Sequence, residues 1–234
     1  MPQPFGAWIK QDSFVTATIR NKRHRFIVVE GPIGVGKTSL ARRLAERLGG
    51  ELLLEEVEQN PFLERFYRGE KNAALSAQLF FLFQRTKQLD ALRQSDLFAR
   101  VHVADFHIDK DRLFAETNLD AEELSLYRQI FERVAAEPPQ PDLVIYLQAS
   151  VDALQQRIAR RGIDYERLID RNYLERLTEA YARHFHDYCD APLLIVNASQ
   201  IDPINNDADF DQLLDHIERT TSGRNFFNPA AALA

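Results

Sequence analysis

Short apolar runs alternate with amphipathic stretches along most of the chain. Continuous apolar runs rich in branched residues are typical of strands that are buried on both faces. Five such runs span residues 26–30, 51–55, 101–105, 143–147 and 193–197. Helical periodicity covers residues 39–48, 61–68, 72–98, 119–136, 151–161, 172–188 and 207–219. This alternation predicts an α/β fold, with a five-stranded parallel sheet and helices on both faces.

The ends of the chain lack this pattern. Residues 1–24 show no periodicity, and we expect an N-terminal extension there. One domain is predicted over residues 25–222, followed by an irregular tail at 223–234. Ligands of such sheets bind at the carboxyl ends of the strands, so we expect the functional residues just after each apolar run.

Composition narrows the class of protein. The chain has 234 residues, 45% of them hydrophobic, which is enough for a sizeable core. A single cysteine, Cys189, excludes an internal disulfide framework and fits a reducing compartment. No run approaches the roughly 18 apolar residues of a membrane span, and the N-terminus has no secretory signal, so a cytoplasmic protein without a membrane partner is expected. The net charge of −6 argues against nucleic acid as a partner.

The clearest motif lies between the first apolar run and the first helical segment. Residues 31–38 match the P-loop pattern G-x-x-x-x-G-K-[ST] in full. In a P-loop the backbone N–H groups hold phosphate oxygens, the lysine reaches the β- and γ-phosphates, and the hydroxyl binds Mg²⁺. The motif therefore predicts ATP and Mg²⁺ as cofactors. The expected cofactor-binding residues are Gly31, Ile33, Gly34, Val35, Gly36, Lys37, Thr38 and Ser39.

A P-loop alone does not identify the phosphoryl acceptor. No Asn-Lys-x-Asp guanine reader follows a late strand, and a motor would need more chain, which leaves a small kinase as the economical interpretation. An acid after the second strand could accept the proton of an attacking hydroxyl. Glu55, Glu56 and Glu58 all stand there, and the residues by themselves do not choose among them.

Over residues 26–197 the chain resembles the deoxynucleoside kinase family, close to its bacterial deoxyadenosine/deoxyguanosine branch. In that family the second strand ends in a Glu-Pro-Val-like element whose glutamate is the general base. Glu55-Glu56-Val57 falls on this element, with glutamate in place of proline. The resemblance therefore implies that Glu55 is the catalytic base.

The resemblance also implies a nucleoside pocket. Tyr67 matches the aromatic residue that contacts the sugar, Gln78 matches the reader of the base, and Arg85 matches the arginine that faces the base. Gln78 and Arg85 are seven residues apart and share a helix face. Asp111 matches an acid that pairs with the arginine.

After the third strand the resemblance is imperfect. Asp105 matches an acid expected near Mg²⁺. Phe106, however, holds the position of a family arginine that contacts either the phosphate or the glutamate that acts as general base. Lys110 or an arginine of the lid could compensate for that loss.

A basic helix end at residues 157–161 resembles the family's arginine-bearing lid over the ATP phosphates. Arg157 and Arg161 match best, and they are expected to neutralise charge in the transition state. Glu166 matches the lid acid that binds the 3′-hydroxyl of the sugar, while Ile163 stands where relatives often have another arginine.

Taken together, these matches imply an ATP-dependent deoxynucleoside 5′-kinase of nucleotide salvage. Deoxyadenosine is the favoured substrate, followed by deoxyguanosine or deoxycytidine, and the resemblance implies a homodimer formed through the long helices. Two alternatives stay open. A nucleoside monophosphate kinase would place a second phosphate where Glu55 repels it, and a non-catalytic ATP-binding module would explain Phe106.

Overall fold

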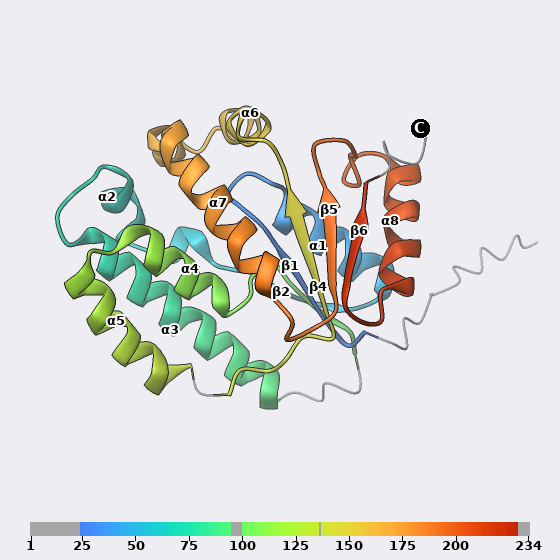
Figure 1. Cartoon of the computed structure of the whole chain (residues 1–234), viewed down its shortest axis with the longest axis horizontal. Coiled ribbons are helices and arrows are strands. Elements are labelled where there is room, and N and C mark those ends of the chain that lie inside the picture. The colour runs from blue at the N-terminus through green and yellow to red at the C-terminus, as the bar shows by residue number, and fades with distance from the viewer. Residues whose placement is uncertain (1–23, 95–99, 136, 229–234) are drawn as a thin grey trace, which may run out of the picture.

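A parallel β-sheet forms the centre of the molecule, as the sequence predicts (Figure 1). The computed structural model describes residues 24–94, 100–135 and 137–228. The strand order is β2-β3-β1-β4-β5-β6, and every neighbouring pair is parallel. The strands are β1 (Phe26–Glu30), β2 (Glu51–Leu53), β3 (His102–Ala104), β4 (Leu143–Gln148), β5 (Leu193–Asn197) and β6 (Arg224–Phe227).

The number of strands differs from the prediction, because the sheet has six strands and not five. The extra strand, β6, lies in the segment predicted to be an irregular tail. It pairs with β5 from Leu193↔Arg224 to Val196↔Phe227 at the edge of the sheet. Its side chains do not form an apolar run, and Phe226 is 67% exposed. Only the pairing with β5, which is distant in sequence, makes this segment a strand.

Helices connect the strands close to the predicted positions. The long ones are α1 (Lys37–Leu48), α3 (Ala73–Gln94), α5 (Ala121–Val134), α6 (Val151–Arg161), α7 (Arg171–Asp187) and α8 (Asp207–Arg219). Three shorter elements are the helix α2 (Leu63–Tyr67) and the 3-10 turns η1 (Val57–Gln59) and η2 (Asp164–Leu168). The predictions for residues 1–23, 95–99, 136 and 229–234 lie outside the described residues.

One helix was not predicted, namely α4 (Asp109–Asn118). Its sequence mixes charged and apolar residues without a continuous apolar stripe, so its periodicity is weak. Asp109 and Asp111 lie in its first turn, where negative charge is favourable near a helix N-terminus. A capping box at Asp120 and Glu123 then begins α5 directly after it.

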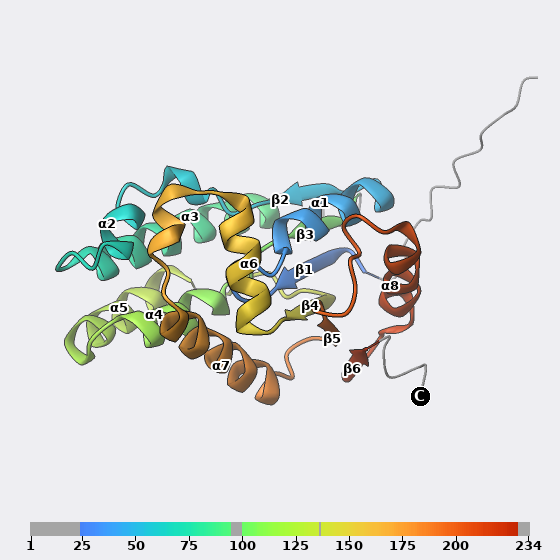
Figure 2. The ribbon, with the colours of Figure 1, turned by 90° about the horizontal axis from the view of Figure 1, so that it is seen from above.

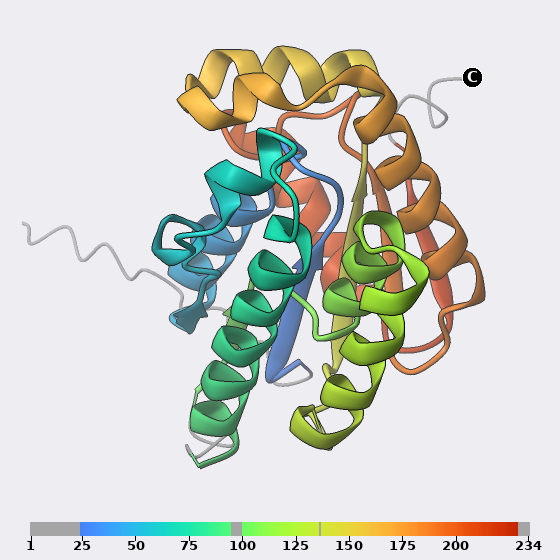
Figure 3. The same ribbon diagram turned by 90° about the vertical axis from the view of Figure 1, so that its left-hand side faces the viewer.

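The helices cover both faces of the sheet. Figure 1 and Figure 2 show α1 and α8 on one face and α4 and α7 on the other, and Figure 3 shows α3 and α5 beside each other at one end. The double covering explains why β1 and β4 are apolar and buried over nearly their whole length. Helix α7 packs on β4 through stacked aromatic rings, with the Tyr146 and Phe185 centroids 4.3 Å apart.

The carboxyl ends of β1, β2 and β3 lie together at one end of the sheet, and α6 and η2 cover this end (Figure 3). Residues that follow these strands are therefore brought together although they are far apart in sequence. Within the described part of the chain, no helix has the length and apolarity that crossing a bilayer requires.

Candidate functional site

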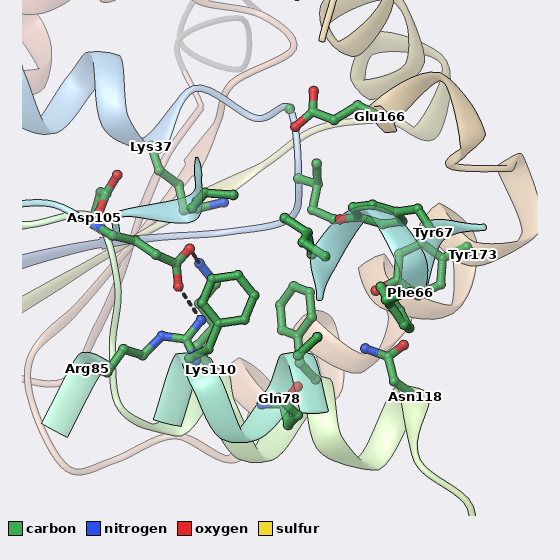
Figure 4. A pocket seen from close by; sticks show the side chains of 18 of the residues that line it. Lys37, Phe66, Tyr67, Gln78, Arg85, Asp105, Lys110, Asn118, Glu166 and Tyr173 are labelled. Carbon is green, nitrogen blue, oxygen red and sulfur yellow. Dashed lines mark hydrogen bonds and ion pairs between the residues drawn. The ribbon is translucent and has the colours of Figure 1, made fainter. Parts of the chain in front are cut away.

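A cavity opens at this end of the sheet (Figure 4). It is lined by the P-loop, the end of β2, α3, α4 and the lid elements α6 and η2. Most of the residues singled out in the sequence line it, namely Ile33, Gly34, Lys37, Thr38, Glu55, Tyr67, Gln78, Arg85, Asp105, Arg161 and Glu166.

The P-loop backbone requires its glycines. Gly31 has φ of +147°, and a Cβ atom there would lie 2.5 Å from the carbonyl oxygen of Leu147. Gly34 has φ of +82°, and a Cβ atom there would lie 2.8 Å from Ile158. Glycine alone tolerates both the backbone conformation and the close contact. The loop then passes into α1, whose first N–H groups point to the place where phosphate binds in other P-loops.

Lys37 lies inside the loop. Its Nζ donates hydrogen bonds to the carbonyl oxygens of Gly31 at 2.7 Å and Pro32 at 3.1 Å. Burial, and next the positive charge of Lys110, lower the pKa of Lys37 to about 8. Other predicted loop residues differ in how exposed they are. Val35 is buried in the core, whereas Thr38 and Ser39 are exposed at the start of α1.

Glu55 lies between two cations at the end of β2. Its Oε1 accepts from Arg85, and its Oε2 accepts from Nζ of Lys110 at 2.7 Å. Burial acts to raise the pKa of Glu55, but Arg85 and Lys110 outweigh it and lower the pKa to about 2. The carboxylate is therefore ionised, and it faces the cavity next to the P-loop.

Asp105 joins this carboxylate to the P-loop. Its Oδ1 accepts from the backbone N–H of Glu55 at 2.8 Å, and its Oδ2 accepts from the hydroxyl of Thr38 at 2.5 Å. Burial raises the pKa of Asp105. A carboxylate and a hydroxyl side by side are oxygen ligands suited to Mg²⁺, which usually takes one or two carboxylates together with substrate phosphates. The residues present therefore fit the metal that the sequence predicts.

A buried polar network forms the floor of the cavity. Arg85 bonds to Asp111 as well as to Glu55, and Asp111 also accepts from the side chain of Gln78 and, at 3.1 Å, from Tyr127. Asp111 is fully buried behind Gln78 and Arg85 and does not line the cavity itself. The structure thus pairs Asp111 with Arg85, as the resemblance implies. The role of the network in reading a nucleobase stays a prediction.

An aromatic wall and the lid close the opposite side. Tyr67 stacks on Tyr165 of η2, with ring centroids 6.0 Å apart, and it lies next to Phe66 (Figure 4). Glu166 is buried beneath the lid and bonds to Nε of Arg161 at 2.9 Å. Burial, with smaller contributions from Tyr173 and Glu166, raises the pKa of Tyr67 well above its usual range, so its hydroxyl stays a hydrogen-bond donor.

The structure separates the two predicted lid arginines. Arg161 lines the cavity, but Arg157 does not. The guanidinium of Arg157 donates to the carbonyl oxygens of Val35 at 3.0 Å and Ala198 at 2.6 Å. It therefore ties the P-loop to the segment that follows β5. The two arginines are one helical turn apart, and they bond to different partners: Arg157 to backbone carbonyl groups and Arg161 to Glu166.

Several cavity residues were not among those predicted to form the site. Phe66, Asn118 and Tyr173 line the side of the cavity near Tyr67. Lys110 lines the side near Glu55, and the sequence had named it only as one of two candidates to compensate for the arginine missing at position 106. Asn118 and Tyr173 had no distinguishing signal, because they come from α4 and α7 and reach the cavity only through helix packing.

Comparison with known proteins agrees with this geometry. A family model described as deoxynucleoside kinase matches residues 27–222. The chain is 36% identical to a deoxyguanosine kinase of Bacillus subtilis over 82% of this chain and 96% of that protein. It is 30% identical to a deoxyadenosine/deoxycytidine kinase of the same organism over 83% and 92%. A solved deoxyadenosine kinase of M. mycoides, with dCMP and dCDP bound, matches with a TM-score of 0.73 and 26% identity over 83% of this chain and 99% of that one.

Proposed function

The chain belongs to the deoxynucleoside kinase family, and from this premise we propose that it transfers the γ-phosphoryl group of ATP to the 5′-hydroxyl of a deoxynucleoside in nucleotide salvage. One observation carries the proposal. Glu55 is an ionised carboxylate that lies between the P-loop residues Lys37 and Thr38 on one side and the pocket of Tyr67 and Gln78 on the other. That arrangement places a base between a phosphate donor and an acceptor with a hydroxyl group.

In this proposal, Glu55 accepts the proton of the 5′-hydroxyl as the oxygen attacks the γ-phosphorus atom. Lys37, the P-loop N–H groups and Arg161 stabilise the negative charge of the phosphates. Thr38 and Asp105 would hold Mg²⁺, which supplies further charge neutralisation when bound. Tyr67 and Glu166 bind the sugar. Gln78 and Arg85 bind the nucleobase, and Asp111 holds both of these side chains from behind.

The charges favour a nucleoside over a nucleoside monophosphate as acceptor. Four cationic side chains line the cavity in the described part of the chain, namely Lys37, Arg85, Lys110 and Arg161. Arg85 and Lys110 are paired with Glu55, and Arg161 is paired with Glu166. Outside the P-loop, a phosphate already on the acceptor would therefore meet Glu55 without a cation left to pair with it.

For the base, we propose deoxyadenosine first, then deoxyguanosine or deoxycytidine, with thymidine disfavoured. The side-chain nitrogen of Gln78 donates to Asp111, which leaves its oxygen as an acceptor, and Arg85 lines the same cavity as a donor. Relatives named for deoxyguanosine and for deoxyadenosine or deoxycytidine support this group of substrates. We propose a cytoplasmic location, which fits a chain with a single cysteine.

The test is an ATP-consumption panel with the four deoxynucleosides and, separately, their 5′-monophosphates. We expect turnover with deoxyadenosine, deoxyguanosine or deoxycytidine and none with the monophosphates. Turnover with the monophosphates alone would instead identify a nucleotide kinase. ATP binding without consumption in every reaction would identify a non-catalytic module.

A further inference from the structure

Lys110 is a buried lysine whose ammonium group faces the cavity. It lies in the first turn of α4 and is only 7% exposed. Lysine is almost never fully buried unless it is paired. Its Nζ donates to Oε2 of Glu55 at 2.7 Å, and the ring of Phe114 lies 5.8 Å away. The burial of Lys110 is thus explained by a single acidic partner, which is the proposed catalytic base.

The two cations on Glu55 differ in how they are engaged. Arg85 bonds to Oε1 of Glu55 and also to Asp111, so it divides its charge between two acids. Lys110 bonds to Oε2, and within the described ranges 24–94, 100–135 and 137–228 Glu55 is the one acid within ion-pair distance of it. Because Arg85 also faces the base pocket, Lys110 is the cation dedicated to the carboxylate.

Lys110 also lies near the phosphate side of the cavity. After burial, its charge is the largest cause of the lowered pKa of Lys37. The two ammonium groups repel each other and face one common region, between the P-loop and Glu55 (Figure 4). The transferred phosphoryl group must pass through that region, and its negative charge would relieve the repulsion.

Position 106 does not supply this charge. The side chain of Phe106 is fully buried in the hydrophobic core and does not line the cavity. Four residues later, at the start of α4, Lys110 places its ammonium group beside the carboxylate of Glu55. The positive charge that the resemblance places at position 106 is therefore supplied to Glu55 by residue 110.

We propose that Lys110 is a positioning residue of this site, whose ammonium group holds the carboxylate of Glu55 in place beside the P-loop. The inference rests on the proposed function, because it acts through the proposed base. Its signature is a loss of kcat at nearly unchanged KM values that arginine at position 110 reverses, which a merely structural role would not produce.

The experiment compares Lys110→Met and Lys110→Arg with the control Lys87→Met, which changes an exposed lysine on α3. We expect Lys110→Met to lower kcat by roughly 10²-fold, because a misplaced general base slows proton transfer, while the KM values for ATP and for the deoxynucleoside change little. Lys110→Arg should restore most of the lost kcat, and Lys87→Met should leave kcat and both KM values unchanged.

A second readout does not depend on turnover. Crystal structures of the same variants record where the carboxylate of Glu55 lies relative to Arg85 and the P-loop. A carboxylate in its wild-type place in Lys110→Met would overturn the inference, as would identical kcat values of Lys110→Met and Lys110→Arg. If Lys110→Met does not fold, Lys110→Gln takes its place. A wild-type protein without kinase activity would overturn the proposed function, while the crystal structures would still decide the role of Lys110.

Discussion

Among the single residues, Glu55 is the one on which the chemistry depends. Substituting it with glutamine keeps the shape and removes the base. We predict that Glu55→Gln lowers kcat by about 10²-fold or more, in line with the usual contribution of a general base. ATP binding should stay nearly intact, because Glu55 lies beside the P-loop and not in it. Steady-state kinetics and ATP titration measure both effects.

The controls are Glu56→Gln and Glu58→Gln, the two acids that sequence alone could not separate from Glu55. Both are exposed in the structure, whereas the side chain of Glu55 is 9% exposed. They should retain wild-type turnover. A loss of the same size in either one, with full activity in Glu55→Gln, would contradict the assignment.

The residues around Glu55 also balance one another in charge. Two buried acids, Glu55 and Asp111, meet two buried cations, Arg85 and Lys110. Removing one partner of such a group leaves an uncompensated buried charge, which typically costs about 3–5 kcal/mol. Single substitutions here therefore need a measurement of folding alongside activity, and this is why the Lys110 experiment includes an arginine variant.

The lid is the element from which we expect contacts to the sugar. Helix α6 ends at Gly162, and η2 then places Glu166 under the lid beside Arg161. We propose that this buried carboxylate accepts a hydrogen bond from the 3′-hydroxyl.

We predict that Glu166→Gln weakens the preference for a 3′-hydroxyl. The KM for the preferred deoxynucleoside should rise by about tenfold, because a hydrogen bond to a charged group contributes roughly 1.5–3 kcal/mol. The KM for the matching 2′,3′-dideoxynucleoside should change little. Asp164→Asn, which changes a lid acid with a 94% exposed side chain, is the control. An equal rise in KM for both nucleosides in Glu166→Gln would argue against contact with the 3′-hydroxyl.

At the scale of the whole molecule, two large apolar side chains are exposed on the outer helices. Phe83 of α3 is 54% exposed and Leu126 of α5 is 48% exposed, on helices that lie beside each other (Figure 3). The homodimer through the long helices, which the resemblance implies, would cover both side chains, and the dimer stays a prediction.

We predict that light scattering during gel filtration gives about twice the chain mass of 27.0 kDa at micromolar concentration. Phe83→Glu combined with Leu126→Glu should give the mass of a monomer, because buried unpaired charge disfavours the contact. Leu52→Glu, on the edge strand β2, is the control and should leave the mass unchanged. A wild-type monomer at these concentrations would rule out the predicted dimer.

Much of the architecture follows from the sequence by itself. The continuous apolar runs required strands covered on both faces, and their alternation with helices required a parallel sheet. The P-loop motif required a loop between β1 and α1 whose backbone conformation only glycine adopts at some positions. Because the carboxyl ends of parallel strands lie at the same end of the sheet, the sequence could predict that Glu55 and Asp105, which follow β2 and β3, share one site. These features depend on local patterns and on rules that hold for all such sheets.

Other features were decided only by tertiary structure. The strand β6 exists because β5 offers it a pairing edge, and nothing in residues 224–227 required it. Phe106 turns into the core while Lys110 reaches Glu55, since the path of the chain into α4 sets which side chain faces the cavity. Arg157 bonds to the P-loop backbone, one turn from Arg161 in the cavity. Long-range packing determines all three, because each depends on partners that are distant in sequence.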